Sequence, residues 1–465
     1  MSLLYVAFAL AVFLFERRRT HGSRVDAITI FVVLFFLQCC LPGIMIYATL
    51  PFVDTVEPTG NEAFDNIFRA TDFTTALLVL ILTIWFAIFF YVGCAVGRLA
   101  LGRRPALTSL LPARSLTVMD GRLLLLLAAG LGVTLWSFYL MGDSLVSRYT
   151  NLILFRAGFE GIERNTLNAN AFALTQSWSW LSVVAVFAIN ERRGKGILWI
   201  ASVALVVIFA LLGVSRRALF LPVLLAFLTL VLYSGKWRAG WLLVGSIPVL
   251  LIVAFGKELL AAAARGAPLE AVTGSYQSFA SALLRPMADM GITIVESLGT
   301  FKFLHLDLRY GIDHVLSIAQ RFPKGTLGID LSFPERIVRI STAAFADPNT
   351  QDIPPGLMGQ MWLDFGILGP VVWGLSFGLQ MSLLSYVFER IRRSLQSTAV
   401  CVLLAFLVAL PLNSGSFDFT FSWDIFAVLL GLLWCVRVSR SDSNAFAYTQ
   451  PVEARIEGSE AGRGT

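Results

Sequence analysis

The sequence predicts an all-α membrane protein: a polytopic bundle of about eleven transmembrane helices with one long loop on the outer side of the membrane. Hydrophobic residues occupy 57% of the 465 positions and charged residues only 14%, whereas about a quarter of a soluble domain is charged. Apolar runs of nearly membrane-spanning length recur along the chain, and basic residues gather in alternate short loops between them. The net charge of +6 therefore indicates membrane topology and no nucleic-acid partner.

Each expected helix is an apolar run bounded by charge or by a Pro/Gly cluster. In chain order the runs are Leu3–Phe15, Ile28–Leu50, Phe73–Gly97, Leu123–Leu140, Ala171–Ile189, Ile197–Val214, Ala218–Tyr233, Trp241–Phe255, a run ending near Phe388, Ala399–Leu412 and Trp423–Val436. The first run is short, and its basic residues follow the apolar stretch. A cleaved signal peptide has the reverse order, so none is expected.

The distribution of basic residues predicts the orientation. One set of alternate short loops carries 17 of them: Arg17, Arg18, Arg19, Arg24, Arg98, Arg103, Arg104, Arg114, Arg122, Arg192, Arg193, Lys195, Lys236, Arg238, Arg390, Arg392 and Arg393. The opposite short loops carry six: Arg69, Arg148, Arg156, Arg164, Arg216 and Arg217. Because basic loops stay on the cytoplasmic side, we expect a multi-pass protein of the bacterial inner membrane with a periplasmic N-terminus and a cytoplasmic C-terminus.

Four regions follow from this layout. Residues 1–255 hold helices 1–8, 256–356 form a long periplasmic loop, 357–438 hold helices 9–11, and 439–465 form a polar, disordered cytoplasmic tail. Within the long loop, apolar residues recur at helical spacing over Ser275–Leu298 (Phe279, Leu283, Leu284 and Met287) and over Ile312–Phe322. These segments are predicted to be amphipathic helices lying on the membrane surface.

The turn Ser215-Arg216-Arg217 places two arginines on the outer side, where the charge rule disfavours them. Ser215 is expected to cap the next helix. The arginine fork suits phosphate oxygens and keeps its charge, so this turn is a candidate anion site. The alternative is a pair of interfacial arginines that reach lipid headgroups.

Other outer arginines are weaker candidates. Arg285 ends an apolar helical stretch and precedes a proline, which would place it near the membrane surface. Arg148, Arg156, Arg164 and Arg321 are candidate substrate-binding residues, although arginines on loops are commonly just solvated.

A polar segment leads into the helix that follows the long loop. It carries Asp347, Asn349 and Asp352, and the helix then begins with Gln360 and Asp364 among glycines. Ionisable groups at membrane depth are costly and favour a functional interpretation. Alternatively, Gly356, Gly359, Gly366 and Gly369 serve ordinary helix packing, and both interpretations can hold together.

Histidines and cysteines suggest no metal or other cofactor. His305 and His314 lie in the long loop, where a neutral imidazole could act as a general base, although a lone histidine is more often structural. The cysteines are Cys39, Cys40, Cys94, Cys401 and Cys435; all lie in or beside apolar runs and are expected in the core. The acidic first outer loop (Asp54, Glu57, Glu62, Asp65 and Asp72) has no adjacent acidic pair and no His or Cys partner.

The layout resembles that of Wzy-type polymerases, which join O-antigen or oligosaccharide repeat units. Three parts carry the resemblance: the Gly213–Leu219 helix turn, the long late loop, and the Pro355–Gly369 stretch, in which Phe365-Gly366 is followed by Gly369. O-antigen ligases share this architecture, but they usually carry a His-Asn pair just before the same helix. Here the matching stretch reads Ile353-Pro354-Pro355-Gly356, which counts against a ligase and leaves the base unassigned.

The resemblance implies a GT-C-like bundle and an inverting, metal-independent transfer on the periplasmic face. A growing glycan would leave undecaprenyl diphosphate and join a new lipid-linked repeat unit. Partners would be the lipid-linked donor and acceptor, membrane lipid and a chain-length regulator. We expect Arg216, Arg217 and Arg285 to bind the diphosphate, and Asp347, Asp352 or His314 to activate the acceptor. Alternatives are a ligase, another lipid-linked glycosyltransferase, or a glycan transporter or flippase.

Overall fold

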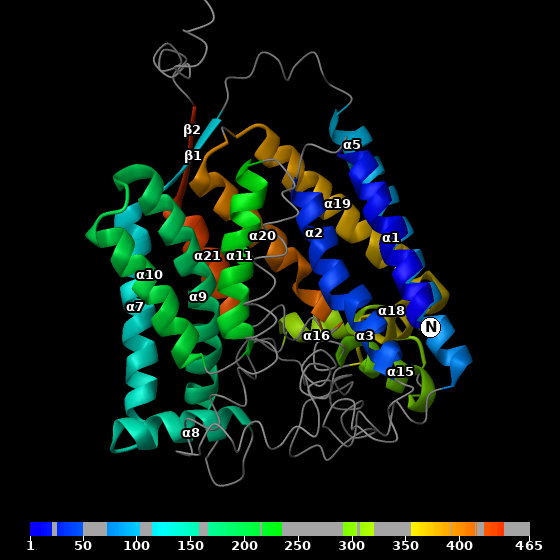
Figure 1. Ribbon diagram of the computed structural model, residues 1–465, viewed down its shortest axis with the longest axis horizontal. Coiled ribbons are helices and arrows are strands. Elements are labelled where there is room, and N and C mark those ends of the chain that lie inside the picture. The colour runs from blue at the N-terminus through cyan, green and yellow to red at the C-terminus, as the bar shows by residue number, and fades with distance from the viewer. Residues whose placement is uncertain are drawn as a thin grey trace, which may run out of the picture.

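The computed structural model describes residues 1–20, 26–49, 72–102, 114–157, 166–213, 216–234, 292–304, 307–319, 355–391, 393–413, 415 and 423–440. The structure is mostly helical (86%), and Figure 1 shows the long helices running side by side in one bundle. The N-terminal half of the bundle contains α1 (Ser2–Arg19), α2 (Ala27–Phe35), η1 (Phe36–Cys40), α3 (Leu41–Thr49), α5 (Phe73–Gly102), α7 (Asp120–Tyr139), α8 (Leu145–Ala157), α9 (Thr166–Arg193), α10 (Ile197–Leu212) and α11 (Arg216–Ser234).

The second half begins with two short helices of the predicted long loop. Its elements are α15 (Ile292–Phe303), α16 (Ile312–Ala319), α18 (Leu357–Phe365), η3 (Gly366–Leu368), α19 (Gly369–Glu389), α20 (Leu395–Ala409), η4 (Leu410–Asn413) and α21 (Trp423–Cys435). Two strands, β1 (Arg114–Val118) and β2 (Val436–Arg440), complete the structure.

Five helical segments are long and apolar enough to cross a membrane: Ala27–Ala48, Phe73–Leu101, Asp120–Tyr139, Leu357–Glu389 and Leu395–Leu412. Three shorter apolar helices are Ile197–Leu212, Phe220–Ser234 and Asp424–Cys435. The length and composition of these helices identify a membrane protein. Helices occupy every predicted run that falls in the described residues, whereas Trp241–Phe255 lies outside them, so the total of eleven spans stays a prediction.

Close glycine packing joins α5 to α19. Gly93 and Gly97 of α5 lie four residues apart, as do Gly374 and Gly378 of α19. A Cβ atom added at Gly93 would lie 2.5 Å from the Leu375 carbonyl oxygen, and one at Gly378 would lie 2.2 Å from the Phe90 carbonyl oxygen. A side chain at either position would therefore clash with the facing backbone, and glycine lets the two helices pack closely, as in membrane helix pairs.

Arg19, at the end of α1, ties three helices together through five residues that we call the inner network. Its guanidinium donates to Glu16 at 2.7 Å and to Asp26, the N-cap of α2, at 2.7 and 2.8 Å. The Tyr91 hydroxyl of α5 donates to Glu16 at 3.2 Å, and Arg98 of α5 donates to Asp26 at 3.0 Å. Two buried or half-buried carboxylates are thus matched by two guanidinium groups.

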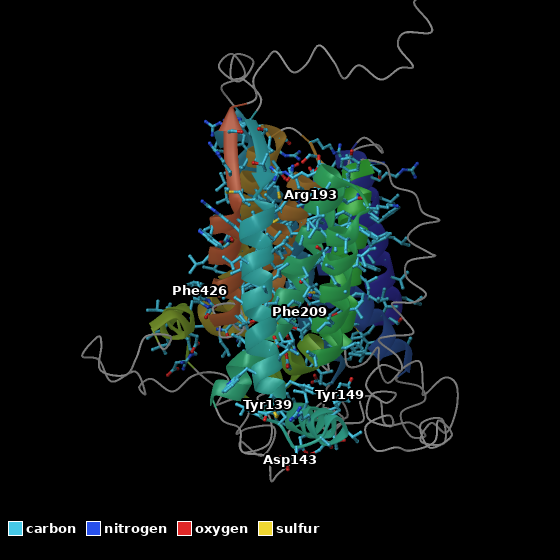
Figure 2. The ribbon with its side chains drawn as sticks, turned by 90° about the vertical axis from the view of Figure 1, so that its left-hand side faces the viewer. Tyr139, Asp143, Tyr149, Arg193, Phe209 and Phe426 are labelled. Atoms are coloured by element: carbon cyan, nitrogen blue, oxygen red, sulfur yellow. The ribbon has the colours of Figure 1, made fainter. Side chains whose placement is uncertain are left out.

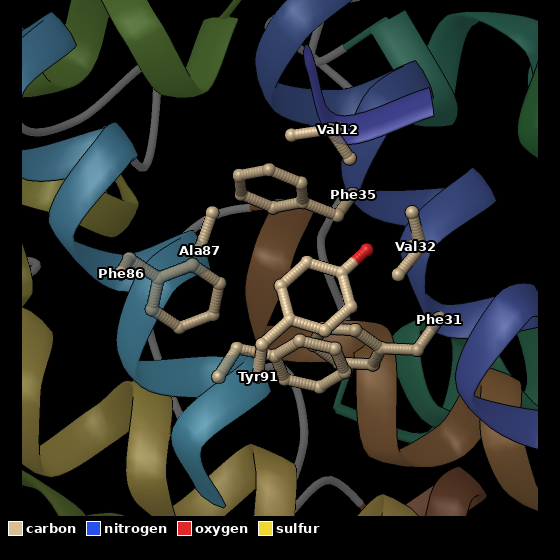
Figure 3. A pocket seen from close by; sticks show the side chains of 8 residues that line it. Val12, Phe31, Val32, Phe35, Phe86, Ala87 and Tyr91 are labelled. Atoms are coloured by element: carbon tan, nitrogen blue, oxygen red, sulfur yellow. The ribbon is translucent and has the colours of Figure 1, made fainter. Parts of the chain in front are cut away.

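An apolar cavity lies beside this network, between α1, α2 and α5 (Figure 3). Its lining consists of Val12, Phe31, Val32, Phe35, Phe86, Ala87, Phe90 and Tyr91. Apart from the Tyr91 hydroxyl, these side chains carry no polar group. The cavity therefore offers nothing to orient a sugar or a phosphate.

The strands correct the all-α expectation. They form an antiparallel pair in which Arg114 faces Arg440 and Val118 faces Val436, joining segments about 320 residues apart. Leu116 and Val118 point into the core, which explains why this stretch is extended: its apolar residues alternate with polar ones. β2 also carries ordered structure to Arg440, past the predicted start of the tail at residue 439.

The two ends of the bundle differ in charge. At the end with β1 and β2 lie Arg17–Arg19, Arg98, Arg122, Arg193 and Arg390, and Figure 2 shows Arg193 there with Asp143 and Tyr149 at the opposite end. That opposite end holds α8, α15, α16 and the start of α11 (Figure 1). We call the strand end the inner end and the other the outer end, following the charge rule.

Candidate active site

Only part of the predicted site falls in the described residues. Outside them lie Ser215, Arg164, Arg285, Arg321, Asp347, Asn349 and Asp352. For Arg156, Arg216 and Arg217 the structure describes the helical backbone alone: α8 contains Arg156, and α11 begins at Arg216, where a cap at position 215 was predicted. The side chains of Arg148, His314 and Gln360 are described.

The outer end of the broken span α18–η3–α19 is fixed by α15. Gly356, at φ 71°, precedes α18, and a Cβ atom there would lie 2.3 Å from the Thr293 carbonyl oxygen. At the same junction the Thr293 hydroxyl oxygen accepts from the Leu357 N–H at 2.9 Å, and the Thr300 hydroxyl donates to the Pro355 carbonyl oxygen at 2.8 Å. The predicted packing role of Gly356 is therefore confirmed.

This contact overturns the expectation for α15. The surface helix was predicted over Ser275–Leu298, of which the structure describes only the part from Ile292, without Phe279, Leu283, Leu284 and Met287. In that part residues 293–300 are all buried, and α15 packs against α18 and α5. The hydroxyl residues of α15 bond to backbone groups at the start of α18. Small polar side chains commonly serve helix contacts in this way.

A turn at residues 309–311 then binds the segment before α16 to the end of α18. The N–H of Arg309 donates to the Leu363 carbonyl oxygen at 2.7 Å, and the N–H of Tyr310 donates to the Asp364 carbonyl oxygen at 2.9 Å. These carbonyls belong to the last turn of α18, where a helix leaves its acceptors unsatisfied. Tyr310 and Gly311 adopt left-handed conformations, at φ 51° and 74°, to make this turn.

These two backbone hydrogen bonds place the start of α16 beside the end of α18. Arg309 pairs with Asp313 through two hydrogen bonds, of 2.6 and 2.7 Å, which hold the first turn of α16. Both side chains of this ion pair are nearly buried. The next residue is His314, so the pair fixes the position of the imidazole.

His314 meets a buried carboxylate, and with three neighbours forms what we call the outer cluster: His314, Gln360, Asp364 and Trp373. The imidazole Nε2 lies 2.8 Å from Asp364 Oδ2. The Trp373 indole N–H donates to the same oxygen at 3.1 Å, and the Gln360 amide donates to Oδ1 at 2.9 Å. The side chain of Asp364 is 0% exposed, whereas that of His314 is 23% exposed.

The donors fix the chemistry of the cluster. An indole can only donate, and the Gln360 nitrogen also donates, so Asp364 acts as an acceptor on both oxygens. Its partner His314 turns Nε2 toward Asp364, and the other ring nitrogen, Nδ1, is a buried atom. A half-buried imidazole oriented by a buried carboxylate is the arrangement used by general bases.

A second buried carboxyl lies nearby on α15. Glu296 is 2% exposed, and its Oε2 has no hydrogen-bond partner among the described residues. Burial raises the pKa of Glu296 well above its ordinary value, because the charged form loses its hydration. Burial therefore favours the neutral form of Glu296, on a helix that packs against α18.

Arg148 is engaged within the protein. Its Nε donates to the Gly142 carbonyl oxygen at 2.5 Å, and its guanidinium carbon lies 4.4 Å from the centroid of the Tyr139 ring. These contacts hold α8 across the outer end of the bundle, as Figure 1 shows. The structure thus places Arg148 in a contact between α7 and α8 and not beside His314.

Sequence reasoning singled out three members of the outer cluster, His314, Gln360 and Asp364, but not their connection. Asp364 stood out as an acid in an apolar helix, and its spacing of four residues from Gln360 was a usable signal. Trp373 gave no signal, because tryptophan in a membrane helix is ordinary. The five cysteines are buried and free, as predicted.

The chain matches no protein-family model, no curated protein and no solved structure. The functional interpretation therefore depends on the residues themselves.

Proposed function

We propose that this chain is a membrane glycosyltransferase that polymerises lipid-linked oligosaccharide repeat units. The observation that carries the proposal is the outer cluster: a partly exposed His314 whose Nε2 lies 2.8 Å from the buried Asp364. This cluster lies at the end of the bundle where α11 begins with Arg216 and Arg217. A base and two permanent cations at one membrane face suit transfer from a lipid diphosphate.

In the proposed reaction, His314 is the catalytic base. Its Nδ1 takes the proton of the acceptor hydroxyl on a new repeat unit, and that oxygen forms a bond to the anomeric carbon of the growing glycan. The bond from this carbon to the diphosphate breaks, and its electron pair leaves with undecaprenyl diphosphate. Attack opposite to the leaving group inverts the anomeric configuration.

Asp364 is proposed as a positioning residue in this step. It orients the imidazole through Nε2, which leaves the buried Nδ1 as the nitrogen that would take the acceptor proton, and it stabilises the imidazolium that forms. The Arg216 and Arg217 side chains would neutralise charge on the departing diphosphate. Arg285 remains a candidate third cation, and Asp347 and Asp352 remain candidates for binding the acceptor.

An O-antigen ligase is the second candidate, and one observation favours it. The sequence argument against a ligase was the missing histidine just before α18. In the fold, His314 reaches α18 from a different segment, through Asp364. A ligase would use the same base and the same leaving group but a different acceptor, so the product distinguishes the two functions.

The test is the surface glycan of a deletion strain complemented with wild type, His314→Gln or Arg216→Lys at matched protein abundance. A polymerase predicts long glycan ladders with wild type and single-repeat products with either variant. Arg216→Lys keeps the charge but loses the two-pronged geometry, so it should be impaired as well.

The deletion strain itself distinguishes the alternatives. Polymer that accumulates on the lipid carrier would identify a ligase. A lipid-linked repeat unit trapped on the cytoplasmic side would identify a flippase. Wild-type ladders from His314→Gln would contradict the proposed base.

A further inference from the structure

Trp373 contacts both functional groups of the outer cluster. Its indole N–H donates to Asp364 Oδ2 at 3.1 Å, the same oxygen that faces His314 Nε2 at 2.8 Å. Its ring also lies 5.1 Å from the His314 ring, centroid to centroid, with an interplanar angle of 66°. Trp373 is 5% exposed and belongs to α19, so it reaches the cluster from a third segment.

The two contacts have opposite effects on the imidazole. An N–H donor on Oδ2 draws negative charge from the oxygen that stabilises protonated His314 and therefore weakens the base. The ring contact is T-shaped, and an indole face turned toward the imidazole favours its protonated form and strengthens the base. Trp373 can thus adjust how readily His314 takes and releases a proton.

Few other charges in the described structure act on this imidazole. On its own segment, Arg309 and Asp313 form an ion pair whose charges cancel. On α18 the facing acid is Asp364, and on α15 the buried acid is Glu296, whose neutral form is favoured by burial. The described outer half of α19 contributes Trp373 and no charged residue.

We propose that Trp373 is a positioning residue that sets the proton affinity of His314, through one hydrogen bond to the shared Asp364 oxygen and one ring contact. The proposal rests on the proposed function for its catalytic meaning. The proton equilibrium itself can be measured without any substrate.

The experiment is a pH titration of His314 by NMR in the full-length protein, held in detergent micelles or nanodiscs and labelled with ¹⁵N-histidine. The chain has three histidines, His21, His305 and His314, so His314→Gln assigns the signal. Variants are Trp373→Phe, Trp373→Leu and Gln360→Met, with Trp362→Phe as the matched control. Trp362 belongs to α18, but its ring packs on Phe301, with the centroids 5.3 Å apart.

Trp373→Phe keeps a ring and loses the N–H donor, so the His314 midpoint should rise by roughly half a pH unit. Gln360→Met removes the other donor to Asp364 and should also raise it. Trp373→Leu removes both donor and ring, so its midpoint should lie below that of Trp373→Phe. Trp362→Phe should leave the midpoint unchanged.

An unchanged midpoint in both Trp373→Phe and Gln360→Met would overturn the proposal, as would an equal shift in Trp362→Phe. If one variant does not fold, the other still decides. In cells, the acid limb of glycan synthesis should move with the NMR midpoint. If the His314 midpoint changes as expected but the protein transfers no glycan, the proposed function is wrong and the inference about Trp373 still holds.

Discussion

The inner network and the outer cluster both hold carboxylates away from water, but they pair them with different groups. In the inner network the carboxylates of Glu16 and Asp26 are held by Arg19, a permanent cation. In the outer cluster Asp364 is held by an amide, an indole and an imidazole. A guanidinium fixes charge at any working pH, whereas an imidazole can change its charge near neutrality. The first arrangement suits structure, and the second suits proton transfer.

The largest expected effect is on turnover at the outer cluster. Asp364→Asn puts an amide where three donors converge, so His314 loses its acceptor and its orientation. Glycan polymerisation per folded molecule should fall by about 10²–10⁴-fold, the usual contribution of a positioned base. Asp26→Asn in the inner network is the control and should retain turnover. Equal losses of turnover in Asp364→Asn and Asp26→Asn would mean that the outer cluster has no special role in catalysis.

The next effect is on stability at the inner network. Arg19→Met leaves Glu16 and Asp26 facing each other without their shared cation, and breaking a buried pair in this way costs about 3–5 kcal/mol. Denaturant unfolding in micelles measures it. The matched control is Arg98→Met: Arg98 is 46% exposed and makes one contact to Asp26, so its loss should cost about 1 kcal/mol or less. Similar costs for both variants would show that the network is not cooperative.

The comparison also shows which features could be predicted from the sequence. Apolar runs are local signals, so the α5, α7, α10 and α20 helices could be predicted from windows of about twenty residues. Contacts between distant segments have no such signal. The hydrogen bond from His314 to Asp364 spans 50 positions and depends on the turn at Tyr310. The β1–β2 pairing spans about 320 positions and has no local trace except alternating residues.

The error over α15 has a similar cause. The spacing of apolar residues predicted an amphipathic helix, but that spacing does not tell whether the apolar face meets lipid or another helix. Gly356 and Gly359 were correctly predicted as packing positions, but their partners could not be read from the sequence. Those partners are the α15 hydroxyl residues, and the match becomes visible only when both helices are in place.

Asp26 of the inner network and the buried Glu296 of α15 should contribute to stability with opposite dependences on pH. For Asp26, burial opposes ionisation, but the hydrogen bonds and charge of Arg19 outweigh it and lower the pKa. That stability should be present above about pH 4 and be lost on acidification. For Glu296, burial raises the pKa, so its contribution should be present below about pH 4 and be lost as pH rises.

Glu296→Gln tests the second sign. The amide is neutral at every pH, so the variant should gain stability over wild type as pH rises. Thermal unfolding at pH 4.5 and pH 8 measures the change, and Asp26→Asn provides the comparison with the opposite slope. A stability difference that is the same at both pH values would mean that Glu296 does not lose its proton in this range.

The smallest expected effect concerns the turn that brings His314 to Asp364. Tyr310 is held at φ 51° although its side chain is 72% exposed, and a left-handed conformation costs a bulky residue about 1 kcal/mol. The hydrogen bonds to the end of α18 hold this turn in place. Asparagine tolerates the conformation without the entropy cost of glycine, so Tyr310→Asn should stabilise the fold by about 0.5 kcal/mol. Gly311, at φ 74°, is the control with the opposite sign: Gly311→Ala should destabilise by about 1 kcal/mol. Thermal unfolding of both variants measures these changes. Destabilisation by Tyr310→Asn would mean that the tyrosine ring contributes more than its backbone strain costs.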